Sequence, residues 1–212
     1  MDFAKITLVV TTQRCKRSDD STLSRNYSTN DRMLRYKQIG QFFFMDTFFA
    51  TSKAGKSPRG NTCCQIFVSD KGFLFGVPMN RKSEVPLALK LFAKENGALD
   101  AIICDAAGEQ KSKEVRKFCH QIGTTLRYLE ESTPRANLSK LYIGLIKESI
   151  RKDMKSSNCP LVFWNYCSKR RARINNLTAK NLFQLECQTL HFTVTWKEGD
   201  IPNLCQFDWY QW

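Results

Sequence analysis

Two aspartates lie within or at the end of strongly apolar stretches of the sequence. Asp46 interrupts the run 41–50 (QFFFMDTFFA), and Asp105 ends the run 100–105 (DAIICD). A buried carboxylate is costly unless a cation pairs with it. Because hard divalent cations take oxygen ligands, both residues are candidate metal ligands or general bases held on rigid strands. A simpler alternative is that Asp46 caps a turn at the end of a strand.

The second feature that bears on function is an excess of basic side chains. The chain has 33 Lys and Arg against 20 Asp and Glu, a formal charge of +13. Such an excess favours a polyanionic partner, most simply nucleic acid. Lys and Arg side chains neutralise DNA phosphates without recognising the base sequence. The alternative is that these residues only form the solvent-exposed face of a helix. The candidate phosphate-binding residues are Lys147, Arg151, Lys152, Lys155, Lys169, Arg170, Arg171 and Arg173.

Composition limits the class of protein. The 212 residues are 42% hydrophobic and 25% charged, which is typical of one globular domain with extensions. No apolar run approaches the ~20 residues that a membrane helix needs, so we expect no membrane partner. The nine cysteines include no Cys-x-x-Cys pair. Free thiols of this kind favour a reducing compartment, the nucleus or the cytoplasm.

The elements that must position the two aspartates follow from hydrophobic periodicity and turn residues. The expected order is three strands, a helix, a strand, a helix, a strand and then two helices. This order predicts an α/β fold with a mixed sheet, part antiparallel and part joined by crossover helices. The expected strands are 41–50, 62–69, 73–78, 100–105 and 125–129, and the expected helices are 84–96, 112–121, 133–155 and 161–175.

The order of elements, with an acid on the first and fourth strands, resembles the ribonuclease-H-like fold of retroviral and retrotransposon integrases. The stretches FFFMDTFFA, IICDAAGEQ and TPRANLSKLYIGLIKE look like the integrase core of copia-type retroelement polyproteins, and 59 residues separate Asp46 from Asp105. The resemblance covers residues 30–185 and implies a five-stranded mixed sheet, three antiparallel strands followed by two parallel ones, flanked by helices.

The resemblance also implies an activity. Integrase cores carry out Mg²⁺- or Mn²⁺-dependent 3′-end processing and strand transfer of element DNA, with two Asp and one Glu holding two metal ions. Asp46 and Asp105 match the two aspartates, as catalytic and metal-binding residues. The implied partners are DNA and a second copy of the chain, with no small-molecule substrate. On this interpretation residues 1–38 are a basic flexible arm, 39–177 the integrase-like catalytic core, and 178–212 an irregular aromatic extension.

The third carboxylate is where the sequence departs from the family. The family's Glu follows Pro-x-x-Asn near the start of the long helix, and after Asn137 this position holds Lys140 or Leu141, with Lys140 favoured. Glu148 lies eight residues beyond Lys140, about 12 Å further along the helix. A lysine removes a ligand and adds a cation that can pair with either aspartate. We therefore expect a nucleic-acid-binding core with impaired catalysis, in a truncated or degenerate copy. The alternatives are an active polynucleotidyl transferase, an inactive remnant, or a nuclease of this fold.

Overall fold

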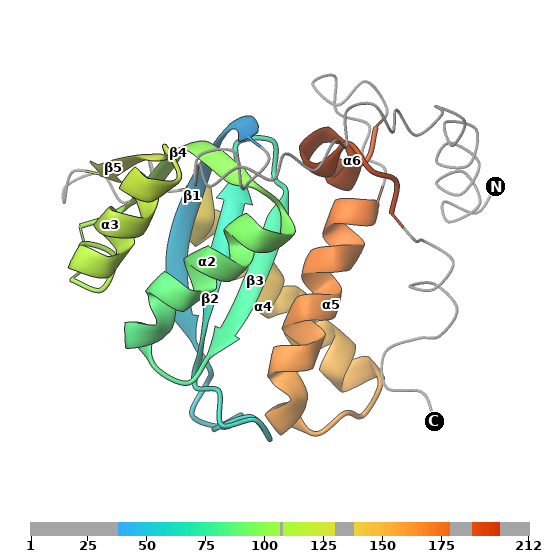
Figure 1. Cartoon of the computed structure of the whole chain (residues 1–212). Helices are drawn as coiled ribbons and strands as arrows, with labels where there is room; N and C mark the ends of the chain where they lie inside the picture. The colour runs from blue at the N-terminus through green and yellow to red at the C-terminus, as the bar shows by residue number, and fades with distance from the viewer. Residues whose placement is uncertain (1–37, 107, 130–137, 179–187, 200–212) are drawn as a thin grey trace.

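A five-stranded sheet forms the centre of the molecule (Figure 1). The computed structural model describes residues 38–106, 108–129, 138–178 and 188–199. The strand order is β3-β2-β1-β4-β5, in which β1, β2 and β3 pair antiparallel and β1, β4 and β5 pair parallel. This confirms the expected mixed α/β sheet. The strands are β1 (Gln38–Phe49), β2 (Cys63–Ser69), β3 (Leu74–Met79), β4 (Ala98–Asp105) and β5 (Thr125–Leu129).

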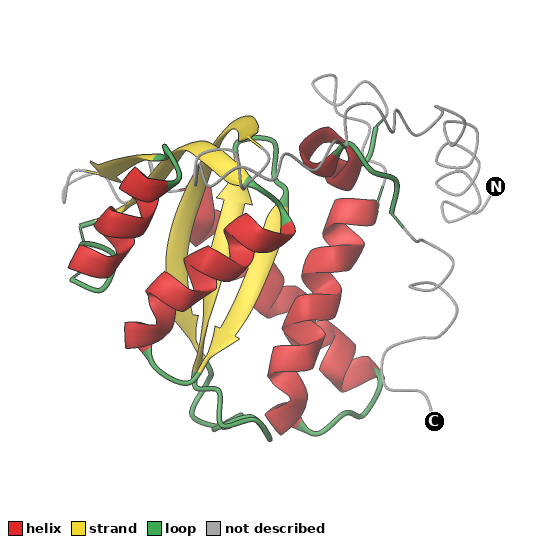
Figure 2. Ribbon diagram, in the orientation of Figure 1, coloured by secondary structure: helices red, strands yellow, loops and turns green. Residues whose placement is uncertain are grey.

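Helices cover both faces of this sheet (Figure 2). Lys82–Glu84 forms a 3-10 turn before α2 (Val85–Glu95), and Leu161–Phe163 forms another before α5. The expected start of α4 near residue 133 lies outside the described residues. Within the described ranges, none of the helices combines the length and apolar character that crossing a membrane requires. The remaining helices are α3 (Lys113–Gln121), α4 (Leu138–Ser156), α5 (Trp164–Leu177) and α6 (Leu190–Thr195).

The short helix α6 stands where the sequence predicted irregular structure. The Thr189 hydroxyl caps it by accepting a hydrogen bond of 3.2 Å from the backbone N–H of Phe192. Leu190 and Val194 are buried against the main core. Six residues are too few for a helical period to be visible in a sequence, and tertiary packing stabilises the element instead.

Alternate residues of β1 serve two separate cores. Phe43 and Met45, both fully buried, pack under α2 and α3. Phe48 belongs to the second core, which α4 and α5 cover from the other face of the sheet. Figure 1 shows α2 in front of the sheet and α4 behind it. Because side chains alternate along a strand, Asp46 lies on the same face as Phe48, the face that α4 covers.

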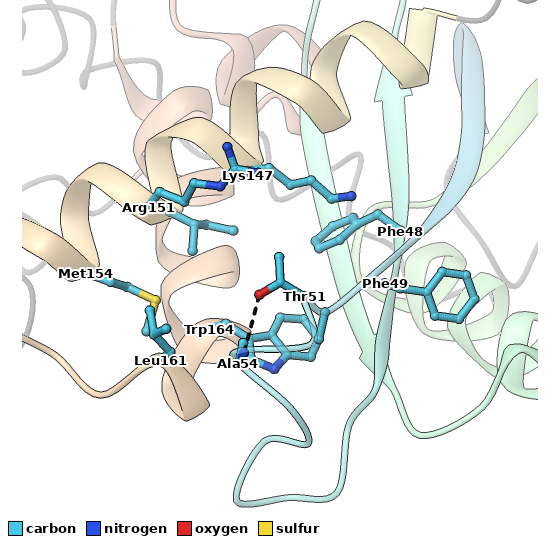
Figure 3. Close-up of a pocket in the computed structure, with 11 residues that line it drawn as sticks. Phe48, Phe49, Thr51, Ala54, Lys147, Arg151, Met154, Leu161 and Trp164 are labelled. Carbon is cyan, nitrogen blue, oxygen red and sulfur yellow. Dashed lines mark hydrogen bonds between the residues drawn. The ribbon is translucent and has the colours of Figure 1, made fainter.

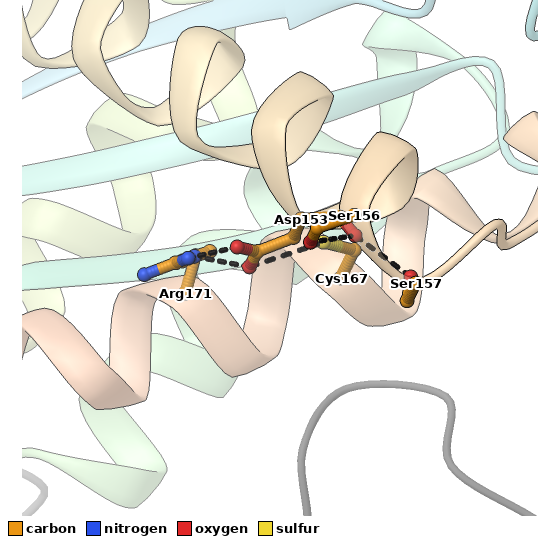
Figure 4. Close-up of polar contacts among 5 residues, drawn as sticks. All are labelled: Asp153, Ser156, Ser157, Cys167 and Arg171. Atoms are coloured by element: carbon orange, nitrogen blue, oxygen red, sulfur yellow. Dashed lines mark hydrogen bonds and ion pairs between the residues drawn. The ribbon is translucent and has the colours of Figure 1, made fainter.

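An ion pair fixes α4 against α5. The carboxylate of Asp153, buried on α4, pairs with both Nε and Nη2 of Arg171 on α5 (Figure 4). The Cys167 thiol lies 3.9 Å from the same carboxylate. The hydroxyls of Ser156 and Ser157 donate to the Asp153 carbonyl at 3.0 and 2.7 Å and close the end of α4. These contacts set the position of α4, and with it the position of Lys140 in its first turn.

Candidate active site

The pairing of β1 with β4 brings the two predicted aspartates together. Met45 pairs with Cys104 in the parallel register, so Asp46 and Asp105 occupy the next position on each strand. Neighbouring strands lie about 4.8 Å apart, and residues at matching positions of parallel strands point to the same face. The two carboxylates are therefore neighbours on the face that α4 covers, where β4 ends and β1 continues to Phe49.

The surroundings of Asp46 disfavour its charged form. Burial is the largest cause and raises the pKa of the Asp46 carboxyl, and the nearby charge of Asp105 raises it further. The backbone N–H of Thr47 donates to Asp46 Oδ1 at 2.7 Å and acts in the opposite direction. The cations of Lys140 and Lys82 also lower the pKa. Two carboxylates that interact in this way attract positive charge to the space between them.

An ammonium group from α4 supplies that charge. Lys140 Nζ lies 2.7 Å from Asp105 Oδ2, with side-chain exposures of 42% and 32% for the lysine and the aspartate. The hydrogen bond to Asp105 is the main reason that the pKa of Lys140 is raised, and the charges of Asp105 and Asp46 add to it. Lys140 is thus cationic at neutral pH and points at the aspartate pair.

This set of residues does not fit a two-metal centre. Such centres use a few carboxylates to hold two cations, and here the pair of carboxylates faces an ammonium. In the described part of the chain, no group of three or more His, Cys, Asp or Glu side chains could hold a metal ion. Glu148 pairs with Lys152 at 2.7 Å on an exposed part of α4 and does not complete the site. A cation that bridges Asp46 and Asp105 would compete with Lys140 for the Asp105 carboxylate.

A second ion pair near this site was missed by the sequence analysis. Lys82 Nζ lies 2.6 Å from Glu109 Oε1, and the same ammonium lies 5.2 Å from the centre of the Phe49 ring. Burial raises the pKa of the Glu109 carboxyl, but its hydrogen bond with Lys82 lowers it overall. The positive charge of Lys82 also lowers the pKa of the Asp46 carboxyl. The only signal in the sequence was the position of Glu109 four residues after Asp105.

The predicted phosphate-binding residues lie on two helices that pack against each other. Lys147, Arg151, Lys152 and Lys155 belong to α4, and Lys169, Arg170, Arg171 and Arg173 belong to α5. The ion pair with Asp153 engages the guanidinium of Arg171, which leaves it less capacity to bind a phosphate. For the other seven residues, phosphate binding stays a prediction.

No protein-family model matches the sequence, and no curated protein matches it. Solved structures do match the fold. The HTLV-2 integrase catalytic core domain in complex with magnesium, in its trimeric form, is 16% identical with a TM-score of 0.56, and the match covers 76% of this chain and 99% of that chain. Its dimeric form is 14% identical with a TM-score of 0.56, covering 74% of this chain and 97% of that chain.

A third structure, the intasome of simian T-cell lymphotropic virus in complex with the PP2A regulatory subunit B56 gamma, is 15% identical with a TM-score of 0.57. That match covers 74% of this chain and 54% of the viral chain. Each of the three matches covers about three quarters of this chain. The chain therefore has the ribonuclease-H-like fold of retroviral integrase catalytic cores.

Proposed function

We propose that this chain is an integrase-type core that binds DNA and whose catalysis Lys140 impairs. The observation that carries the proposal is the 2.7 Å contact between Lys140 Nζ and Asp105 Oδ2, beside Asp46. The fold of retroviral integrase cores supports the class of protein. The formal charge of +13 and the basic residues of α4 and α5 support DNA as the partner.

Impairment follows from what a divalent cation needs. Mg²⁺ and Mn²⁺ are the cofactors of the proposal, and the HTLV-2 core was solved in complex with magnesium. Asp46 and Asp105 are the residues that would hold such an ion, whose role is to polarise a phosphodiester oxygen. Lys140 opposes its binding in two ways, because the ammonium competes for Asp105 and supplies no oxygen ligand.

The proposal extends to the origin and the partners of the chain. The FFFMDTFFA, IICDAAGEQ and TPRANLSKLYIGLIKE stretches support a copia-type retroelement, and Lys140 is consistent with a degenerate copy. HTLV-2 cores were solved in dimeric and trimeric forms, which supports self-association, and a viral intasome shares the fold. The place of action in this proposal is the nucleus or the cytoplasm.

A Mn²⁺-dependent strand-transfer assay tests the proposal. We expect little activity from the wild type and a gain of activity in Lys140→Glu, which restores a carboxylate. Lys140→Gln removes the ammonium without adding an anionic ligand and separates the two effects. Lys94→Glu makes the same change of charge on the exposed end of α2, on the opposite face of the sheet, and should not gain activity.

Two outcomes would contradict the proposal. Strong wild-type activity that Lys140→Glu leaves unchanged would identify an active polynucleotidyl transferase. Cleavage of an RNA–DNA hybrid in preference to duplex DNA would identify a nuclease of the same fold.

A further inference from the structure

The loop between β1 and β2, residues 50–62, is basic and contains no acidic residue. The sequence has no aspartate or glutamate between Asp46 and Asp70. The cations of the loop, all exposed, are Lys53, Lys56 and Arg59. Among the described residues, none of these three takes part in an ion pair. The loop therefore presents three positive charges that no carboxylate within it offsets.

Hydrogen bonds stabilise the conformation of this loop. The backbone N–H of Asn61 donates to Ser57 Oγ at 3.0 Å, and the Ser57 hydroxyl donates to Asn61 Oδ1 at 3.0 Å. The Asn61 amide also donates to Oδ1 of Asn80, just after β3, at 2.9 Å. Ala54 and Ser57 are buried. Because the loop is ordered before any partner arrives, its cations bind with a smaller entropic cost than those of a flexible segment.

The start of α5 contacts the end of the loop. Asn165 Nδ2 donates to Asn61 Oδ1 at 3.1 Å, and the guanidinium carbon of Arg59 lies 5.1 Å from the centre of the Tyr166 ring. The loop and the start of α5 lie side by side at the lower end of the molecule in Figure 1. Helix α5 contains no acidic residue, and Lys169 lies one turn beyond Tyr166 on the same side. The positive charge of the loop thus continues along α5.

The first residues of the loop lie beside α4. Thr51 and Ala54 line a pocket together with Lys147 and Arg151 of α4, and Phe48 is part of its wall (Figure 3). The ammonium of Lys147 lies 5.3 Å from the centre of the Phe48 ring. The 11 residues that line this pocket include no carboxylate. The basic surface therefore extends from the loop to α4 without an intervening negative charge in the pocket.

The loop begins close to the aspartate pair. Residue 50 follows Asp46 by four positions, about 13 Å along β1. This length corresponds to about four nucleotide steps of one DNA strand. Lys147 follows Lys140 by seven residues, about 10.5 Å along α4. A duplex whose backbone passes Asp46 thus meets the basic side chains of α4 and the loop within about half a helical turn.

We propose that Lys53 and Lys56 of the β1–β2 loop bind phosphates of a DNA duplex that lies across the aspartate pair. The inference rests on the DNA binding of the proposed function and is independent of its catalysis. Duplex DNA carries one negative charge per about 1.7 Å, so cations distributed over a loop and two helices can each meet a phosphate. Contacts of this type position the duplex without recognising its sequence.

Fluorescence anisotropy tests this inference with the full chain and a labelled DNA duplex of arbitrary sequence over a range of salt concentrations. Lys53→Gln combined with Lys56→Gln removes two cations from the loop. If each lysine binds one phosphate, the slope of log affinity against log salt concentration should fall in magnitude by about 1.8. Between roughly 50 and 200 mM salt, the wild type should therefore lose about 12-fold more affinity than the variant.

Lys90→Gln combined with Lys94→Gln is the matched control. Both lysines are exposed on α2, on the opposite face of the sheet, and the double substitution makes the same change in net charge. This control should keep the salt dependence of the wild type, because phosphates that contact the loop do not reach α2.

Asn61→Ala tests whether the order of the loop matters. It keeps every charge and removes the side chain that binds Ser57 and Asn80. Ordering the loosened loop on binding should weaken the affinity by about two- to tenfold. Asn96→Ala removes an amide hydrogen bond of 3.2 Å to the Phe92 carbonyl at the end of α2 and is the control, with no change in affinity expected.

The outcomes separate this inference from the proposed function. A salt dependence that the loop variant leaves unchanged, with DNA still bound, would overturn the role of the loop and leave DNA binding in place. An equal fall in the Lys90 and Lys94 variant, or an affinity that Asn61→Ala does not alter, would also contradict a specific role of the loop. Absence of wild-type binding at low salt would overturn both proposals. Tighter binding of polyglutamate than of the duplex would identify an acidic protein as the partner of the loop instead.

Discussion

Lys140 Nζ lies 2.7 Å from Asp105 Oδ2, so that an ammonium faces a pair of carboxylates on neighbouring parallel strands. The pair comes from the sheet, because Asp46 and Asp105 occupy the next matching position after Met45 and Cys104. The ammonium comes from the first turn of α4. The fold thus builds a carboxylate site of the kind that binds a cation and fills it with a cation of its own.

The raised pKa of Asp46 makes the stability of the protein depend on pH. The folded state binds a proton at Asp46 more tightly than the unfolded state, in which the carboxyl has its ordinary pKa of 3.8. The folded state is therefore favoured in acid, and this contribution is lost as the pH rises from 3.8 through the folded-state pKa. We expect Asp46→Asn to raise the melting temperature at pH 7 by up to a few degrees, and to have little effect below pH 3.8.

Thermal melts of the wild type and Asp46→Asn across this pH range check the prediction. Asp100→Asn, at the exposed start of β4, removes a carboxylate from another site and is the control. A melting temperature that Asp46→Asn lowers at pH 7 would show that charged Asp46 stabilises the fold.

Removing the partner of Arg171 should destabilise the protein. Asp153→Ala leaves a partly buried guanidinium without its carboxylate, and we expect a loss of about 2–4 kcal/mol in the free energy of unfolding. Asp153→Leu combined with Arg171→Met should recover much of this loss, because apolar packing can replace a buried pair. Urea denaturation measures both.

Lys152→Ala is the control for this pair, since Lys152 and Glu148 are an exposed pair on the same helix. It should change stability little, because exposed ion pairs contribute little. If Asp153→Ala were equally mild, the contact between α4 and α5 would not depend on the ion pair.

Two glycines that contact or belong to α4 should respond to alanine in opposite directions. Gly72 has a φ of +92°, and a Cβ there would collide with the Tyr142 hydroxyl. We expect Gly72→Ala to cost about 1–3 kcal/mol. Gly144 lies within α4 with open space around its Cβ position, so Gly144→Ala should stabilise by about 1 kcal/mol. Equal effects in chemical denaturation would contradict this description of α4 and its contact with the β2–β3 turn.

The two strands that carry Asp46 and Asp105 could be predicted from the sequence because they depend on local patterns. The apolar runs that contain Asp46 and end at Asp105 predicted two buried strands that each present a carboxylate. The shared face follows from the register of β1 with β4 in the structure. The residues that modify the site depend on tertiary packing. Lys82 and Glu109 are 27 positions apart, and no period connects them.

The role of Arg171 on α5 could not be predicted from the sequence either. In sequence it belongs to a run of basic residues, and nothing separates it from Arg170 or Arg173. Burial against Asp153 gives Arg171 a structural contact in the folded chain. The pocket beside Phe48 was also not predicted, since three elements far apart in the sequence form it.

The most direct test of the account is calorimetric titration of Mn²⁺ into the wild type and Lys140→Glu. The account predicts no saturable binding to the wild type and stoichiometric binding to Lys140→Glu, which Asp46→Asn or Asp105→Asn in that background abolishes. Equally tight binding to both proteins, lost on Asp105→Asn, would show that the Lys140 ammonium does not exclude a metal ion from the aspartate pair.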